Sequence, residues 1–132
     1  MRPEHKWRGR LLTGLCWFLA LELFLFAPLK FYPGSLGKWP SYQEKFIHWG
    51  YPGWFRMVVG AAELLAAVLL LLPRRRFLGA ALMVFILIGA VTTHFVNHDS
   101  IGDSISAPIH LTFAFIVALA TWPADWRQLF AR

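Results

Sequence analysis

Five ionisable side chains lie within stretches of the sequence that are otherwise apolar, where they could hold the polar head of a ligand or move protons. Two are carboxylic acids, one is a guanidinium and two are imidazoles: Glu22, Glu63, Arg56, His94 and His110. A charged carboxylate at the centre of a membrane span costs about 2.5–3.5 kcal/mol on insertion scales. Such groups must therefore face the protein interior, be paired or be protonated. We interpret all five as candidates for ligand binding and proton relay.

The two carboxylic acids are expected at the same depth. Glu22 lies eight residues before Lys30, and Glu63 lies nine residues after Trp54, where Lys30 and Trp54 mark the outer edges of their stretches. At a rise of about 1.5 Å per residue, both carboxyls lie about 12–14 Å below the outer interface. Two such groups on neighbouring helices could share one proton or hold one ligand. The alternative is a structural polar network that only fixes helix packing.

Small residues on two of the stretches are expected at helix contacts. Gly60 and Ala67 share one helical stripe with Glu63 in the second stretch. Gly89 and Ala90 lie in the third stretch, where Ala90 shares a helical face with His94. Because small residues let a neighbouring helix approach closely, these stripes should face inward.

A metal site is the alternative for part of this set. His94 and His98 are spaced one helical turn apart, and Asp99 and His110 follow, which together offer enough nitrogen and oxygen donors for zinc. Residues 97–106 are polar and rich in turn-forming residues, however, and predict an exposed loop. We therefore expect no bound metal, with His94 and His98 as the pair to examine.

Other catalytic patterns are missing from the sequence. It contains no phosphate-binding glycine loop, no Gly-x-Ser-x-Gly and no nucleophile with an adjacent base. The single cysteine, Cys16, excludes an intramolecular disulfide or a Cys-x-x-Cys redox centre. We expect a binding or accessory protein rather than an enzyme on its own.

Four apolar stretches, each long enough to cross a bilayer, must position these side chains: residues about 11–29, 54–72, 77–96 and 105–122. A helix of about 20 apolar residues spans a hydrocarbon core of about 30 Å. Hydrophobic residues make up 58% of the chain and charged residues only 15%, against about 45–50% and about 25% in soluble domains. The sequence predicts an all-α integral membrane four-helix bundle, formed by a single domain over residues 1–132.

The basic residues predict the orientation of the four spans. Nine Lys and Arg residues precede the first span, separate the second from the third or follow the fourth, and four lie on the other side. The positive-inside rule then predicts cytoplasmic N- and C-termini. The net charge of +6 is explained by this topology and by anionic lipid headgroups, so we expect no binding of nucleic acid.

The long connection between the first two spans, residues 30–53, is rich in aromatic residues and predicts an ordered outer loop. Ser41 and Glu44 form a capping-box pattern that opens a short helix. Tyr42, Phe46 and Trp49 would share one face of this helix, which we expect to lie flat at the membrane interface. The alternative is a lid over a pocket that opens to the outer leaflet.

The chain resembles the DoxX-like family of small four-helix bacterial membrane proteins. The resemblance depends on Gly50-Tyr51-Pro52 before the second span, Gly60-x-x-Glu63, Pro73-Arg74, Gly79, and Gly89-Ala90 followed by His94. It implies a multi-pass protein of the bacterial inner (plasma) membrane that meets a quinone or the subunits of a membrane oxidoreductase. Some relatives are associated with thiosulfate:quinone oxidoreductase, and the lone cysteine leaves no thiol chemistry to carry over.

Three functions remain open from the sequence. The first is a subunit or ligand-binding component of membrane redox chemistry that accepts a quinone or another hydrophobic small molecule in an outer-half pocket. The second is an acid–base isomerase of a lipid-like substrate, with Glu63 and His110 as the proton-transfer pair. The third is a non-catalytic assembly protein whose polar residues only hold the helices together.

Overall fold

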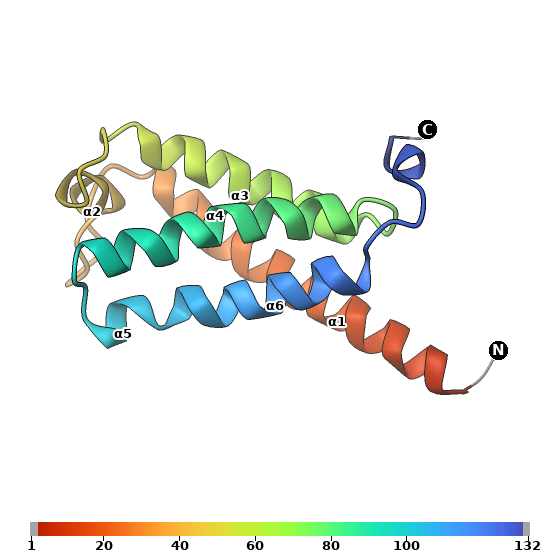
Figure 1. Ribbon diagram of the computed structural model, residues 1–132. Helices are drawn as coiled ribbons and strands as arrows, with labels where there is room; N and C mark the ends of the chain where they lie inside the picture. The colour runs from red at the N-terminus through yellow and green to blue at the C-terminus, as the bar shows by residue number, and fades with distance from the viewer. Residues whose placement is uncertain (1–2, 131–132) are drawn as a thin grey trace.

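The computed structural model describes residues 3–130, and side chains from residue 6 onward, as helices joined by short turns and one long loop (Figure 1). The α-helices are α1 (Pro3–Phe26), α2 (Tyr42–His48), α3 (Phe55–Leu71), α4 (Arg76–Val96), α5 (Ile101–Ser104) and α6 (Ser106–Ala120). Two 3₁₀ helices, η1 (Ala27–Phe31) and η2 (Trp126–Leu129), complete the described part, which contains no β-strand.

Proline and a capping box set the ends of the helices near the long loop. Pro28 occupies the first turn of η1, directly after α1 ends at Phe26. Ser41 caps α2, since its hydroxyl accepts from the Glu44 N–H at 3.1 Å while the Glu44 carboxylate accepts from the Ser41 N–H at 2.9 Å. The short helix and its capping box are thus confirmed, whereas its location at a membrane interface stays a prediction.

Three helical segments are long and apolar enough to cross a membrane: Lys6–Phe31, Arg76–Val96 and Ile101–Ala120. The third of these segments consists of α5 and α6, which are separated only by Ile105. Helix α3 has 17 residues, fewer than any of these three segments. The sequence predicted a crossing there too, and that fourth crossing stays a prediction.

The four longest helices pack around one another. Helix α3 contacts α1 and η1, α4 contacts α3 and α6, and α6 returns to α1 (Figure 1). The start of α1 and the end of η2 lie at one end of these helices, and α2 and α5 lie at the other (Figure 1). The two ends of the described chain lie together because the four long helices run back and forth along the molecule an even number of times.

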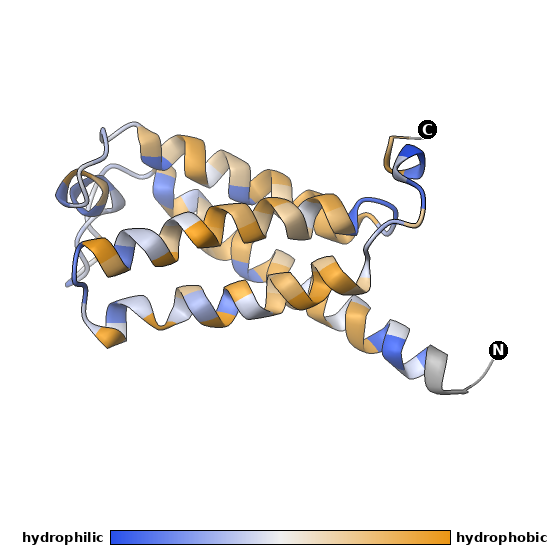
Figure 2. Cartoon of the chain, viewed as in Figure 1, coloured by the Kyte–Doolittle hydropathy of each residue, from blue (hydrophilic) through white to orange (hydrophobic). Residues whose placement is uncertain are grey.

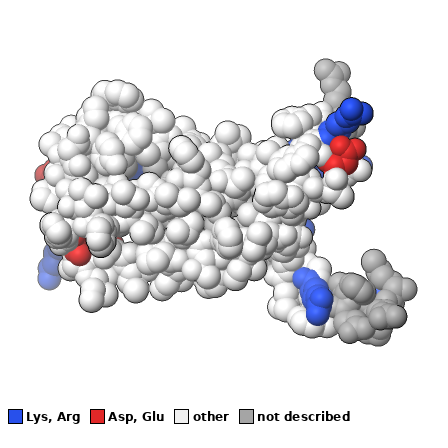
Figure 3. Space-filling model, in the orientation of Figure 1, with Lys and Arg blue, Asp and Glu red and all other residues white. Residues whose placement is uncertain are grey.

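Apolar side chains cover the middle of the molecule, inside and out. Figure 2 shows the long helices mainly in the hydrophobic colour, and Figure 3 shows charged residues of the visible face only toward its two ends. Large apolar side chains are exposed halfway along the helices, such as Leu65 (55%), Phe85 (78%) and Ile116 (48%). An apolar outer surface of this kind is expected where lipid is the solvent.

The core consists largely of small and medium side chains. Ala20, Ala66, Ala67, Ala80 and Ala114 are fully buried. They are accompanied by Cys16, Leu19, Leu70 and Val117, which are also fully buried. Small side chains allow close approach of the helix backbones, which is how helices associate in lipid without a hydrophobic driving force.

Glycines show where two helices come closest, and one of them corrects the sequence analysis. A Cβ on Gly79 would lie 2.8 Å from the backbone nitrogen of Leu70 and 2.9 Å from the Ala66 carbonyl oxygen, so α4 meets α3 at Gly79. Gly89 is exposed, and a Cβ there would meet nothing within 4 Å. Gly89 was expected at a helix contact and takes no part in one within the described chain, while Ala90 is half-buried.

These two glycines form a matched pair for a packing test. We expect Gly79→Ala to destabilise the protein by about 1–3 kcal/mol, because the added methyl group overlaps the α3 backbone. Gly89→Ala should leave stability at or slightly above the wild-type value, because the new methyl group meets open space and alanine favours the helix. Thermal unfolding of both variants in one detergent compares them, and equal unfolding temperatures would contradict the close α3–α4 contact.

Candidate functional site

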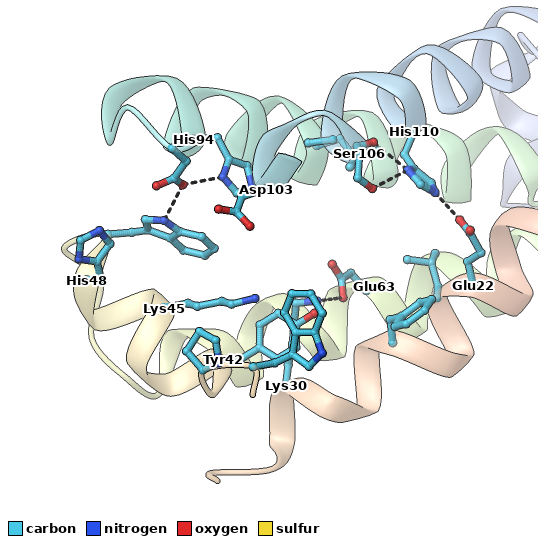
Figure 4. Close-up of a pocket in the computed structure, with 18 of the residues that line it drawn as sticks. Glu22, Lys30, Tyr42, Lys45, His48, Glu63, His94, Asp103, Ser106 and His110 are labelled. Carbon is cyan, nitrogen blue, oxygen red and sulfur yellow. Dashed lines mark hydrogen bonds and ion pairs between the residues drawn. The ribbon is translucent and has the colours of Figure 1, made fainter. Parts of the chain in front are cut away.

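A cavity of about 960 Å³ lies at the end of the helices that carries α2 and α5 (Figure 4). Its lining includes residues from α1, η1, α2, α3, α4, α5 and α6. Four of the five candidates from the sequence line it: Glu22, Glu63, His94 and His110. The floor is apolar, with Leu23, Met83 and Leu87, and the α2 side is aromatic, with Trp39, Tyr42 and Trp49.

Glu22 on α1 is paired with His110 on α6. The Nε2 atom of His110 contacts Oε2 of Glu22, and Nδ1 of His110 lies 2.8 Å from the backbone oxygen of Ser106. Because a carbonyl oxygen only accepts, Nδ1 must carry a hydrogen. The contact with Glu22 then holds one proton, which resides either on the imidazole or on the carboxyl. Such a contact can give or take a proton from a bound molecule.

Glu63 on α3 is paired with a residue that the sequence analysis used only to mark the edge of the first span. Lys30 Nζ lies 2.9 Å from Glu63 Oε2, and both side chains are mostly buried, at 11% and 14% exposed. Lys30 also lies over the ring of Tyr42, 4.5 Å from its centroid. The contact does not have the geometry of a hydrogen bond, so this buried oxygen has no hydrogen-bond donor within the described part of the chain.

The local backbone explains how Lys30 reaches Glu63. The chain leaves α1 at Pro28 and continues as η1, which turns Lys30 toward α3. A Cβ on Gly60 would lie 3.2 Å from the Ala27 carbonyl oxygen and 3.2 Å from Lys30 Cβ, so η1 rests directly on the α3 backbone. Gly60 precedes Glu63 by one turn on the same face of α3. In the Gly-x-x-Glu pattern, Gly60 therefore lets η1 approach α3, and Glu63 is the acid that pairs with Lys30.

One hypothesis from the sequence was that Glu22 and Glu63 share one proton, and the structure does not place them as such a pair. Each has instead its own basic partner, His110 for Glu22 and Lys30 for Glu63. Both still line one cavity, so both remain available to a ligand.

Arg56 lies outside this group, which corrects the expectation that it lines the pocket. Its side chain is buried, its Nη1 donates to the carbonyl oxygen of Gly53, and its Nε has no partner in the described part of the chain. It is not among the lining residues of the cavity. Arg56 is thus bonded to the turn that leads into α3.

His94 belongs to a cluster with Trp49 and Asp99, which we call the Asp99 cluster. The Asp99 carboxylate accepts from Trp49 Nε1 at 2.9 Å and meets His94 Nδ1 at 2.7 Å. The hydrogen bond with His94 is the main reason that the pKa of Asp99 falls below 3.8, and the indole N–H and the nearby His48 lower it further against the effect of burial. The cluster fastens the long loop to the end of α4.

The proposed metal pair is not assembled. His94 faces Asp99, and His98 is exposed in a left-handed backbone conformation with φ of 54°. Within residues 3–130, no group of three or more His, Cys, Asp or Glu side chains is placed to hold a metal ion.

A family model described as the DoxX-like family matches residues 15–121 of the chain. This range runs from the middle of α1 to the end of α6 and includes both ion pairs and the Asp99 cluster. Comparison with curated proteins and with solved structures gives no match.

Removing the ammonium of Lys30 should expose the cost of a buried unpaired carboxylate. We expect Lys30→Met to destabilise the protein by up to about 3–5 kcal/mol, because Glu63 is left without its cation. The double variant with Glu63→Gln should regain most of this loss, since no charge is then stranded. Thermal unfolding of the wild type, the two single variants and the double variant gives a double-mutant cycle, which measures the coupling between Lys30 and Glu63. A double variant no more stable than Lys30→Met alone would contradict the pairing.

The Asp99 cluster should contribute stability that depends on pH. A lowered pKa means that the folded state favours the carboxylate, so its contribution is present above pH 3.8 and is lost as the pH falls through the lower folded-state pKa. We therefore expect Asp99→Asn to unfold at a lower temperature than the wild type at pH 7, with a smaller difference below pH 3.8. Trp49→Phe, which removes one donor, should act in the same direction more weakly. A difference that grows as the pH falls would be the opposite result.

Proposed function

Because the chain belongs to the DoxX-like family of membrane proteins, we propose that it binds a hydrophobic small molecule with a polar head, such as a quinone, in this cavity. In this proposal the protein acts as a subunit or ligand-binding component of membrane redox chemistry. The observation that carries the proposal is the convergence of two partnered carboxylates, Glu22 and Glu63, on one cavity of about 960 Å³. Ligand pockets commonly enclose about 300–1,000 Å³ and orient the ligand with a few polar groups on apolar walls.

The proposed placement in the membrane follows from the helices. Helices α1, α3, α4 and α6 cross the bacterial inner membrane, with both chain ends cytoplasmic and α2 at the outer interface. Although α3 has only 17 residues, this is about the minimum length of a transmembrane helix. The arrangement of α1 and η2 at the end opposite α2 supports an even number of crossings (Figure 1). The cavity then lies in the outer half of the membrane, within reach of a lipid-soluble molecule.

The polar groups of the cavity suit a carbonyl-bearing head. Lys30 supplies an N–H donor for a carbonyl oxygen, beside the buried Oε2 of Glu63. The contact between Glu22 and His110 supplies or accepts one of the two protons that a quinone exchanges on full reduction or oxidation, and the other exchanges with water. The electrons come from a redox partner, so on this proposal the chain is not an enzyme on its own.

The geometry of His110 also supports a second candidate, an acid–base isomerase of a lipid-like substrate. The imidazole is held by Ser106 on one side and Glu22 on the other, as in a base oriented by a third group. Glu22 replaces Glu63 as the acid of this pair. Incubation with a sterol-like ketone in deuterated water, followed by mass spectrometry, tests it. Deuterium uptake that requires His110 supports isomerase chemistry, and no uptake refutes it.

Ligand binding is tested with the purified full-length protein and decylubiquinone. Trp39 and Trp49 line the cavity, so binding should quench their fluorescence in a saturable manner. We expect Glu22→Gln and Glu63→Gln to fold but to bind at least about tenfold more weakly, a loss of about 1.4 kcal/mol or more. His98→Gln serves as the control, because His98 is exposed and does not line this cavity.

The purified protein offers a second readout of the same proposal. Mass spectrometry of small molecules retained through a mild detergent purification should reveal a quinone or a lipid-like compound. Unchanged affinity in both carboxylate variants, together with an empty cavity after purification, would favour the assembly protein whose polar residues only hold the helices together.

A further inference from the structure

The acidic groups of the cavity are all engaged with other groups of the protein. Five carboxylates line it, and two of them form the ion pairs already described: Glu22 with His110 and Glu63 with Lys30. The other three are held by Ser41, by Trp49 and His94, and by Ser100: Glu44, Asp99 and Asp103, respectively. A ligand that needed a free carboxylate would have to break one of these contacts.

Two basic groups of the cavity are not engaged in this way. Lys45 and His48 lie one turn apart on α2, and both line the cavity. Among the interactions of residues 3–130, neither side chain forms an ion pair or a hydrogen bond. Lys45 lies over the Tyr42 ring at 5.1 Å, and His48 acts on Asp99 through its charge alone. Figure 4 shows the Lys45 side chain reaching from α2 into the cavity.

The surroundings of Lys45 leave its charge without a carboxylate. The ring of Tyr42 is shared with Lys30, which lies 4.5 Å from the centroid and already has Glu63. Glu44, next to Lys45 in the sequence, is committed to the capping box. An aromatic ring stabilises an ammonium less than a carboxylate does, so Lys45 remains a strong donor to an acidic oxygen.

We propose that Lys45 binds an oxyanion of the ligand, so that the molecule held in the cavity carries an acidic head. A carboxylate, a phosphate or an ionised ring hydroxyl has the required chemistry, since each accepts a charge-assisted hydrogen bond from an ammonium. The apolar body of the molecule then rests on Leu23, Met83 and Leu87 at the floor. This inference rests on the proposed function and narrows its ligand to hydrophobic acids.

Two sources provide such a head, a free hydrophobic acid or an anionic lipid. The two are separated by measuring the full-length protein in nanodiscs of neutral phosphatidylcholine, where no anionic lipid competes. The probes are a 2-hydroxy-3-alkyl-1,4-naphthoquinone, whose ring hydroxyl is ionised at pH 7, and its neutral methyl ether. The two molecules share ring and tail and differ in the oxyanion.

In the wild type we expect the acid to bind about tenfold more tightly than the ether, a difference of about 1.4 kcal/mol. Lys45→Gln should abolish this preference, so that acid and ether bind with similar affinity. Lys38→Gln is the control, because Lys38 is exposed in the same loop and does not line the cavity. The control should keep the full preference.

The outcomes separate this inference from the proposed function. Binding of both probes with equal affinity in the wild type, or an undiminished preference in Lys45→Gln, overturns the inference and leaves the proposed function standing. If neither probe binds, the proposed function fails for quinones, and native mass spectrometry from mixed nanodiscs then decides the inference. Retention of phosphatidylglycerol over phosphatidylcholine that depends on Lys45 identifies a lipid as the acid, and no such retention overturns the inference.

Discussion

The requirement that a carboxylate inside an apolar helix must have a partner organises the end of this protein that carries α2. Glu22 lies in the apolar second half of α1, and Glu63 lies in the mostly apolar α3. An unpaired charge at either position would be costly. The partners come from different elements, α6 for one and η1 for the other. The two ion pairs thereby connect α1 to α6 and η1 to α3.

The pairs also explain why small residues lie where they do. Lys30 reaches Glu63 because Gly60 lets η1 rest on the α3 backbone. Away from the cavity, alanines and Gly79 allow the helices to pack closely. Close packing at one end and polar pairs at the other leave a cavity that the long loop covers. The protein thus combines close helix packing with a polar cavity at the end that carries α2.

The long loop contributes to the cavity more than an interfacial anchor would. Helix α2 places Tyr42, Lys45 and His48 in its lining, and the Asp99 cluster fastens the loop to α4. The alternative of a lid over a pocket therefore fits the position of this segment. Lys45 of this segment lines the cavity without a carboxylate partner within the described chain.

The helices depend on local chemistry, so the sequence alone could predict them. Apolar length, Pro28 and the Ser41–Glu44 box each act through residues close together in the chain. The equal depth expected for Glu22 and Glu63 stays a prediction. The partners depended on the tertiary structure, because helix rotation and the turn of η1 decide that His110 meets Glu22 and that Lys30 rather than Arg56 meets Glu63. Gly79 and Gly89 look alike in sequence, and only the packing of α4 on α3 buries one and exposes the other.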